Sequence, residues 1–403
     1  MLAKRPKRLL SAFRSAFRPV FRPVFRIVLF LLPFLFGFSP PALAIETIAE
    51  QAFLIDMTTG EVLFEKNADQ PMAPASMSKM MTAYMIFERL RDGSLTLEDT
   101  FTVSENAWRK GGAKSGGSTM FLEPGKRVRV EDLLRGIIVQ SGNDASIVVA
   151  EALASSEAAF AEEMTVRAKE LGLQNTVFKN ATGWPDPEHL TTAKDLALLV
   201  KRTIKDFPEY YHYYAEKEFT YNTIRQINRN PLLYKNIDAD GLKTGHTVES
   251  GYGLTASATK GDRRLILVVN GLPTKKDRSR EPERLLNWGF RDFNNYRLFS
   301  AGEEVTEADV WLGREAKVPL VIEREMLLTI ARKARRKMKV TVTFENPIPA
   351  PIVKGDPVAK LVLTIPGRDK LEVPLLAGAA VERLGLFGRL GTALKAIIWG
   401  QSG

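Results

Sequence analysis

The sequence predicts an α+β domain, a small all-β domain after it and an amphipathic helix at the C-terminus, and the patterning of apolar residues carries this prediction. Strand-like alternation occurs at both ends of the first domain, and the segments between have the composition of buried helices. The expected strands are 52–56, 61–65, 252–258 and 265–270, and the expected helices are 76–90, 133–139 and 145–154. Strands from the two ends can complete one antiparallel sheet, with the helices packed beside it.

The second domain is marked by a change of pattern after Trp288-Gly289-Phe290. From there, short β-type runs broken by glycine and proline, such as 339–344 and 359–365, are typical of a small β-sandwich. We expect the α+β domain at 45–295 and the β-sandwich at 296–380. A sizeable core is available, because 45% of the 403 residues are hydrophobic.

Residues 1–44 have the features of a secretory signal peptide. They contain eight lysines or arginines and no acidic residue, an apolar run follows Arg26, and Ala42-Leu43-Ala44 offers small residues for cleavage. The apolar run is shorter than the ~20 residues that cross a bilayer, and Pro33 interrupts it. We therefore expect export with cleavage; a retained membrane anchor is the alternative.

The C-terminal segment 381–403 predicts a helix that lies on a membrane surface. Basic residues mark one side of the expected helix, and no acidic residue follows Glu382. The apolar positions recur at helical spacing and are Leu384, Phe387, Leu390, Leu394, Ile397 and Ile398. Gly385, Gly388 and Gly391 weaken the helix in water, so an apolar–water interface should stabilise it. A helix packed on the β domain is the alternative.

Composition excludes several functions. Residues outside the first 44 carry only +2 of the formal net charge of +10, and no recognition motif accompanies them, so we expect no nucleic-acid partner. The chain has no cysteine, which excludes disulfides and thiol chemistry. Its only histidines are His189, His212 and His246, too few for a typical His/Cys zinc site. We expect no metal and no cofactor.

Three short motifs supply the chemistry. Ser76-Met77-Ser78-Lys79 places a hydroxyl and an amine on one helix face, where a neutral lysine can activate the serine. Ser141-Gly142-Asn143 lies between two expected helices, and Lys243-Thr244-Gly245 precedes an expected strand. Each motif alone is weak, since Ser257–Lys260 also fits the first and Ser104–Asn106 the second. Their combination in this order is specific.

In this order the motifs resemble those of serine peptidase family S11, the D-alanyl-D-alanine carboxypeptidases or low-molecular-mass penicillin-binding proteins. Further matching segments are Asn228–Asn230, Asp240–Thr247, Ala181–Trp184 with His189–Ala193, and Leu285–Phe290. The resemblance extends over nearly the whole mature chain. It implies a serine β-lactamase/DD-peptidase-like domain that removes the terminal D-alanine from peptidoglycan stem peptides through an acyl-enzyme and is acylated by penicillins.

The resemblance also implies roles for individual residues. Ser76 would be the nucleophile and Lys79 its general base, acting directly or through Ser141. Ser141 would pass a proton to the departing D-alanine, supported by Lys243. Asn143 would bind the substrate amide.

The oxyanion hole and the carboxylate site follow in the same way. The backbone N–H groups of Ser76 and His246 would hold the oxyanion. The terminal carboxylate would bind Thr244, Arg229 and Arg278, with Arg280 as an alternative to Arg278. The side chain of His246 is interpreted as structural, not as the base of a Ser-His-Asp triad, and Gly245 should let a substrate backbone approach closely.

Two other functions compete with this interpretation. A β-lactamase shares the fold and needs a glutamate for deacylation; Glu218–Asn222 fits the spacing but lies in a strand-like stretch. A catalytically idle wall-binding scaffold is the other alternative, and intact Ser76, Lys79, Ser141 and Lys243 argue against it.

The expected partners are stem peptides, β-lactams and the lipid surface of the inner membrane, with the enzyme on its periplasmic face. Six basic residues lie close together in the second domain: Arg332, Lys333, Arg335, Arg336, Lys337 and Lys339. We interpret it as a solvated loop or strand edge, with contact to anionic lipid or wall polymer as the alternative.

Overall fold

The computed structural model describes residues 45–386 and residue 388. The expected signal peptide, and the expected terminal helix beyond residue 388, lie outside the described residues. Within the described part of the chain, no helix is long and apolar enough to cross a membrane.

The first domain is built on a five-stranded antiparallel sheet in the order β2-β1-β9-β8-β7. Its strands are β1 (Gln51–Asp56), β2 (Val62–Lys66), β7 (Ala239–Thr247), β8 (Gly251–Lys260) and β9 (Arg263–Leu272). Strand β1 from the start of the domain pairs with β9 from its end, for example Leu54 with Leu267. The predicted closure of one antiparallel sheet from both ends is therefore confirmed. Strand β7 forms one edge of this sheet.

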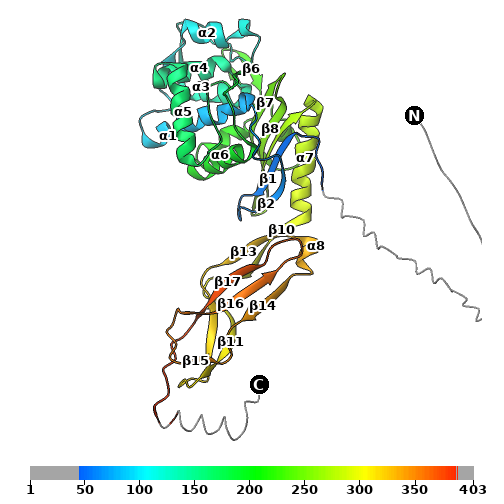
Figure 1. Cartoon of the computed structure of the whole chain (residues 1–403). Coiled ribbons are helices and arrows are strands. Elements are labelled where there is room, and N and C mark those ends of the chain that lie inside the picture. Colours follow the sequence, from blue (N-terminus) through cyan, green and yellow to red (C-terminus); the bar gives the residue numbers. More distant parts are fainter. Residues whose placement is uncertain (1–44, 387, 389–403) are drawn as a thin grey trace, which may run out of the picture. The chain divides into compact units, whose positions relative to one another are not determined.

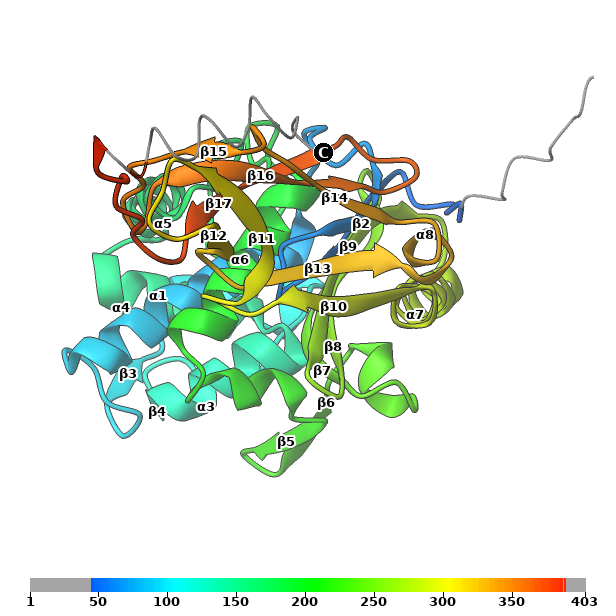
Figure 2. The same cartoon turned by 90° about the horizontal axis from the view of Figure 1, so that it is seen from below.

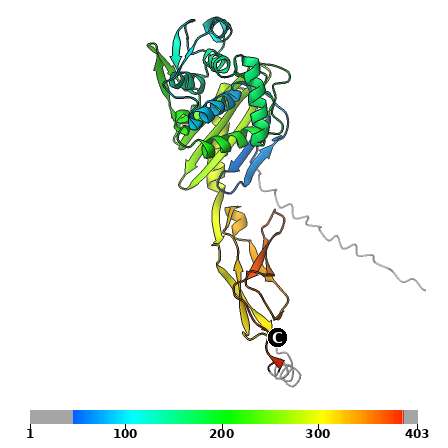
Figure 3. The same cartoon turned by 90° about the vertical axis from the view of Figure 1, so that its left-hand side faces the viewer.

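Helices cover both faces of the sheet. Figures 1 and 3 show a thick helical layer on one side, and Figure 1 shows α7 on the other. The helices are α1 (Lys79–Asp92), α2 (Glu105–Gly111), α3 (Val130–Arg135), α4 (Asn143–Ala154), α5 (Glu157–Leu171), α6 (Ala193–Asp206) and α7 (Lys275–Asp292). Short 3-10 turns, a two-stranded sheet of β3 (Thr100–Thr102) and β4 (Arg127–Arg129) on either side of α2, and a hairpin of β5 (Glu218–Tyr221) and β6 (Ile224–Ile227) lie between the helices.

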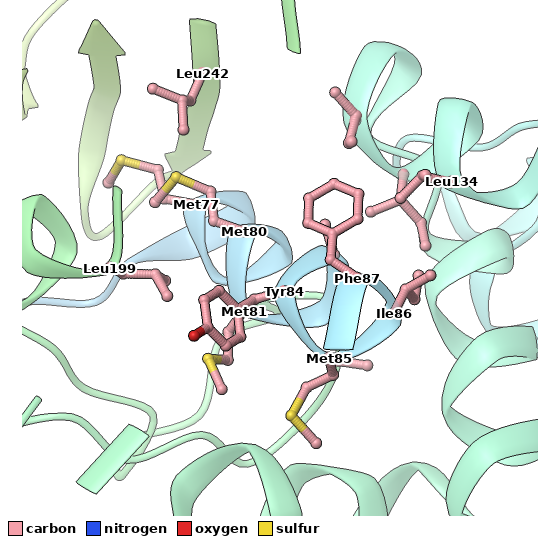
Figure 4. Packing of buried hydrophobic residues seen from close by; sticks show 14 of the residues in the cluster. Met77, Met80, Met81, Tyr84, Met85, Ile86, Phe87, Leu134, Leu199 and Leu242 are labelled. Atoms are coloured by element: carbon pink, nitrogen blue, oxygen red, sulfur yellow. The ribbon is translucent and has the colours of Figure 1, made fainter. Parts of the chain in front are cut away.

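Helix α1 runs through the centre of the helical layer. Its residues from Lys79 to Phe87 are all buried, so the helix is apolar on nearly every side instead of along one stripe. Figure 4 shows Met77 and Met80 beside Leu242 of β7, and Phe87 directed toward Leu134 of α3. A helix held by packing on all sides gives a rigid support to the residues at its N-terminus.

The second domain is β-rich. Its main sheet has the order β14-β16-β17-β12-β11-β15, and β10 pairs with β13 in a separate two-stranded sheet. The strands are β10 (Phe293–Phe299), β11 (Glu304–Trp311), β12 (Lys317–Ile322), β13 (Met326–Ala331), β14 (Lys339–Thr343), β15 (Ile348–Pro349), β16 (Pro357–Thr364) and β17 (Leu371–Ala377). Val318, Leu320, Leu361, Leu363 and Leu375 are fully buried and form its core. Strand β10 starts three residues before the expected boundary at 296.

The β-rich domain also includes residues that we expected at the start of the terminal helix. Val381 forms a bridge with Ile352, and Arg383 forms one with Gly313. The N–H of Leu384 donates to the carbonyl of Leu312. These bonds satisfy backbone groups that a helix starting at Val381 would leave to other partners, so any terminal helix begins after Leu384.

Candidate active site

The expected nucleophile lies at the entrance to α1. Ser76 belongs to the 3-10 turn η1 (Ala75–Ser78), and Lys79 is the first residue of α1. The Nζ atom of Lys79 lies 3.2 Å from the Oγ atom of Ser76, within hydrogen-bonding distance. The two side chains therefore share one face of the helical segment, as their spacing predicts.

Lys79 is enclosed by polar groups from separate parts of the chain. Its Nζ donates to Oδ1 of Asn143 at 2.8 Å and to the carbonyl of Thr182. Burial lowers the pKa of Lys79 to about 7, with help from the positive charge of Arg229 and partial opposition from Asp144 and Glu157. Near neutral pH, both the charged and the uncharged amine are therefore populated.

The Ser141-Gly142-Asn143 motif lies at a break between two helical segments. A π-helical segment, η3 (Gly136–Gln140), ends at Ser141, which has a φ of +66°, and α4 begins at Asn143. The Oγ atom of Ser141 is buried and has no hydrogen-bond partner among the described residues. Left-handed backbone at a serine costs energy, and such strain clusters at functional sites.

The Lys243-Thr244-Gly245 motif lies on β7, the edge strand of the sheet. Lys243 and Thr244 are buried, and the Nζ of Lys243 donates to the carbonyl of Thr244 at 3.2 Å. Burial lowers the pKa of Lys243 well below its usual value, and the charges of Lys79, Arg229 and Arg278 lower it further.

Gly245 also packs against the segment that leads to Ser76. A Cβ atom at this position would lie 2.7 Å from the carbonyl oxygen of Pro74 and 3.2 Å from Cβ of Ala75. The segment leading to Ser76 occupies the space that a side chain at position 245 would need. The glycine therefore lets β7 pack closely against that segment.

His246 and Arg278 both contact the ring of Tyr252. The ring of His246 stacks on Tyr252 at 3.8 Å between centroids and 6° between planes, and its Nδ1 lies 3.0 Å from the carbonyl of Gly251. The guanidinium of Arg278 lies over the same tyrosine ring at 5.3 Å and donates to the carbonyl of Gly245. Among the described residues, no hydrogen bond joins His246 to Ser76.

A cleft of about 810 Å³ brings most of the expected residues together. Its lining includes Ser76, Ser141, Arg229, Thr244, His246 and Arg278. Arg229 lies at the rim and donates to Ser118, whereas Arg278 is buried, with an Nε atom that has no partner in the described structure. No aspartate or glutamate belongs to the described residues that line this cleft, which therefore suits an anion.

The two arginines of α7 differ in their surroundings. Arg278 lines the cleft, and burial lowers its pKa to about 10. Arg280 is mostly exposed and pairs with Asp277 and Glu281 outside the cleft. Of the two residues that the sequence left as alternatives, Arg278 is thus the one that lines the cleft.

The chance matches to the motifs lie away from the cleft. Ser104 is the N-cap of α2 and accepts from the N–H of Ala107. Ser257–Lys260 runs along β8. Glu218 lies in the β5–β6 hairpin and pairs with Arg225.

Sequence reasoning missed the groups that shape the backbone around Lys79. Oδ1 of Asn180 accepts from the N–H groups of Thr182, Gly183 and Trp184, which folds the turn that offers the Thr182 carbonyl to Lys79. Asp144 accepts from the hydroxyl of Thr119 and from backbone N–H groups at 120 and 122, fixing the loop beside Ser118. The only local signal was the position of Asn180 and Asp144 beside the matched segments.

His189 stabilises the 3-10 turn η1, which carries Ser76, through a hydrogen bond to Ser78. The N–H of Lys179 donates to Nδ1 of His189, so its Nε2 carries the proton and donates to Oγ of Ser78 at 2.8 Å. The hydroxyl of Ser78 in turn donates to the carbonyl of Ala75. Burial lowers the pKa of His189 to about 4, so this chain of bonds persists at neutral pH.

Comparison with known proteins agrees with this geometry. A family model described as D-alanyl-D-alanine carboxypeptidase matches residues 38–274, more than half of the chain. The chain belongs to the D-alanyl-D-alanine carboxypeptidase family. A second model, the C-terminal domain of penicillin-binding protein 5, matches residues 293–383 of this carboxypeptidase.

Relatives and solved structures cover most of the carboxypeptidase. DacC of Escherichia coli K12 is 42% identical over 366 residues, which are 88% of this chain and 92% of the relative. Penicillin-binding protein 5 of Haemophilus influenzae superposes with a TM-score of 0.70 at 38% identity, over 84% of this chain and 99% of that one. Penicillin-binding protein D2 of Listeria monocytogenes, solved in a cefotaxime-bound form, superposes with a TM-score of 0.53 at 29% identity, over 62% and 99%.

These matches confirm the predicted family and activity. The protein is a serine-type D-alanyl-D-alanine carboxypeptidase of peptidase family S11 and a penicillin-binding protein. Its two-domain organisation, an α+β peptidase domain followed by a β-rich domain, is that of the matching family models.

Proposed function

We propose that the carboxypeptidase trims stem peptides through an ester formed on Ser76, with Lys79 as the general base. The main support is the 3.2 Å contact between Ser76 Oγ and a buried amine whose pKa is about 7. The uncharged amine accepts the hydroxyl proton while Oγ bonds to the carbonyl carbon of the penultimate D-alanine. The short distance favours direct transfer to Lys79.

The leaving group needs a proton as the C–N bond breaks. Ser141 is suited to pass the proton from Lys79 to the amine of the departing D-alanine, since its buried Oγ lines the cleft and is without a partner among the described side chains. Lys243 is a second buried amine, and the charge of Lys79 lowers its pKa further, so protonation of both amines at once is disfavoured. Water then attacks the ester carbon and restores the Ser76 hydroxyl.

The developing oxyanion would bind the backbone N–H groups of Ser76 and His246. Both residues line the cleft, one in η1 and the other on the edge strand β7. Donors fixed in secondary structure need no reorganisation when the charge forms, which is why such groups contribute strongly to rate. Asn143 would orient the substrate amide, since its Oδ1 is held by Lys79 and its amide nitrogen can donate.

The terminal carboxylate of the substrate would bind Thr244, Arg229 and Arg278. Support comes from the cationic lining of the cleft and from the buried Nε of Arg278, which has no partner in the described structure. An arginine fork matches a planar carboxylate. This recognition would restrict the enzyme to free C-termini.

The test compares a D-Ala-D-Ala peptide with its C-terminal amide. Arg278→Gln should lower kcat/KM for the free acid by roughly 10- to 150-fold, because a charge-assisted hydrogen bond contributes about 1.5–3 kcal/mol, and should change amide turnover little. Arg280→Gln, an exposed and ion-paired neighbour, is the matched control and should leave both rates near wild type. Equal losses on acid and amide would exclude the role.

Neither competing function has structural support. Glu218, the residue expected to deacylate a β-lactamase, is on an exposed hairpin and bound to Arg225. An idle scaffold would not need the buried, pKa-shifted pair of Lys79 and Lys243.

We further propose that the exported enzyme is held on the periplasmic face of the inner membrane by the segment after Leu384. The apolar and basic residues of that segment carry the proposal. The β-rich domain includes the chain up to Leu384, which leaves the amphipathic part available for lipid.

A further inference from the structure

A stretch of the β-rich domain carries cations that no acidic neighbour neutralises. Helix α8 (Arg332–Arg335) follows β13 directly, and β14 starts at Lys339. Between Glu325 and Glu345 the sequence has no acidic residue. We name this stretch the basic turn, and its six cations are Arg332, Lys333, Arg335, Arg336, Lys337 and Lys339.

The cations of the basic turn face solvent without ion-pair partners. All except Arg335 are exposed, and none forms an ion pair with any residue in the described ranges. Elsewhere in the same domain cations do find acids. The pairs are Arg297–Glu325, Arg314–Glu382, Lys317–Glu307, Arg324–Glu323 and Lys360–Glu372.

The basic turn is an ordered element. The guanidinium of Arg335 lies over the ring of Tyr296 at 5.4 Å, and the N–H of Lys337 donates to the carbonyl of Ala334. Met338 packs against the apolar core of the domain. These contacts fix the backbone, so a ligand would meet a preformed array of charges and less ordering entropy would oppose binding.

The basic turn lies at the end of the β-rich domain where the chain enters from the peptidase domain. Ala331, the residue before α8, pairs with Phe293, the first residue after α7 of the peptidase domain. Figure 2 shows α8 at this end of the β10–β13 pair. The segment proposed to contact lipid leaves the β-rich domain beyond Arg383, which bridges Gly313 shortly after the end of β11. Figure 1 shows the labels β11 and β15 at the opposite end of the β-rich domain from α8.

We propose that the basic turn binds the carboxylate-bearing wall polymer on which the enzyme acts. The proposal rests on the proposed function, because the stem peptides of that polymer end in carboxylates and repeat along it. Repeated weak pairings between several cations and several carboxylates add up to useful affinity even when each pair is solvated. The basic turn thereby keeps the peptidase domain near successive substrates.

A charge-matched pair of variants tests this binding. One carries R332Q, K333Q, R336Q and K337Q; the control carries R314Q, K317Q, R324Q and K360Q, which removes the same charge from ion-paired sites of the same domain. Both are mixed with purified insoluble peptidoglycan in detergent at low salt and sedimented. Loss of the basic turn should weaken co-sedimentation at least about tenfold, at a few-fold per solvated contact, and the control should sediment like wild type.

Several outcomes would overturn the proposal. These are equal loss in both variants, no sedimentation of the wild type, or a loss seen with phosphatidylglycerol vesicles but not with peptidoglycan. Turnover of a soluble D-Ala-D-Ala peptide separates this proposal from the catalytic one, because the basic-turn variant should retain wild-type kcat/KM. If it fails to fold by thermal unfolding, the double variant K333Q/K337Q and the control K317Q/K360Q replace the quadruple pair.

Discussion

At the residue scale, the surroundings of Lys79 suit the role of base that we propose for this side chain. Burial disfavours its charged form, and Arg229 adds positive potential, while Asp144 and Glu157 act in the other direction. The net effect lowers the pKa to about 7, where a base can be both unprotonated and basic enough to take a proton. Three hydrogen bonds fix its position against Ser76, Asn143 and Thr182.

This environment predicts the pH dependence of acylation. Because the uncharged amine is the active form, the rate of penicillin acylation should rise with pH through a midpoint near 7. Arg229→Gln removes a positive charge that lowers the pKa of Lys79, so its midpoint should move to higher pH. Arg225→Gln, in the preceding strand β6 and paired with Glu218, is the control. A profile that falls with pH, or an unmoved midpoint in Arg229→Gln, would contradict the assignment.

The three motifs predicted which residues meet in the cleft, but not the bonds among them. Their order along the chain indicated a family, and the family supplied the roles. That Lys79 contacts the Thr182 carbonyl depends on the turn around Asn180, and that turn forms from side-chain-to-backbone bonds which hydrophobic periodicity does not register.

At the scale of elements, the 3-10 turn η1, which carries Ser76, is held by close contact with its neighbours. Ala75 has a φ of +48°, which is strained for alanine. Its carbonyl accepts a hydrogen bond from the Ser78 hydroxyl. Gly183, with a φ of +78°, packs directly against that carbonyl: a Cβ would lie 1.8 Å from the oxygen. The surrounding elements thus determine the position of Ser76.

Gly183→Ala should therefore damage both stability and activity. Gly261→Ala is the matched control, since Gly261 also has a positive φ, +58°, but nothing within 4 Å of its Cβ position. The control should lose about 1–2 kcal/mol of unfolding free energy from backbone strain alone. Gly183→Ala should lose at least ~2 kcal/mol more from the steric clash, with slower penicillin acylation while still folded. Equal losses in denaturant unfolding would show that the packing does not constrain the turn.

The arrangement of elements was predictable in its main lines. Alternating apolar residues at both ends of the first domain predicted the strands, and the antiparallel pairing of β1 with β9 completes the sheet as expected. The sequence predicted the position of helix α1 but not its complete burial. That burial comes from α3, α6 and β7, which are distant in sequence. Strands such as β10 begin a few residues from the expected boundary, where no glycine or proline marks the change.

At the scale of the whole molecule, the account places two functions in different parts of the chain. The peptidase domain holds the cleft, and the β-rich domain carries the basic turn and leads to the amphipathic C-terminal segment. The formal net charge of +10 comes mainly from the expected leader. On the proposed account, local clusters such as the basic turn, and not the total charge, therefore decide which anions the protein binds.

Membrane attachment should depend on the C-terminal segment alone. A chain ending at Leu386 keeps the bridges of Val381 and Arg383, so it should fold, remain soluble after export and cleave small peptides at the wild-type rate. The full exported chain should pellet with membranes, because its apolar stripe is buried at the lipid interface. Recovery of both chains in the soluble periplasmic fraction would contradict the anchor and leave the catalytic assignment untouched.

The most direct test of the central claim, that Ser76 carries the acyl group, is the mass of the intact protein after brief exposure to benzylpenicillin. Wild type should gain the mass of one penicillin molecule, and peptide mapping should place it on Ser76. Ser76→Ala should gain nothing while keeping its thermal unfolding midpoint. An adduct on another residue of the wild type, or a stable adduct on Ser76→Ala, would contradict the claim.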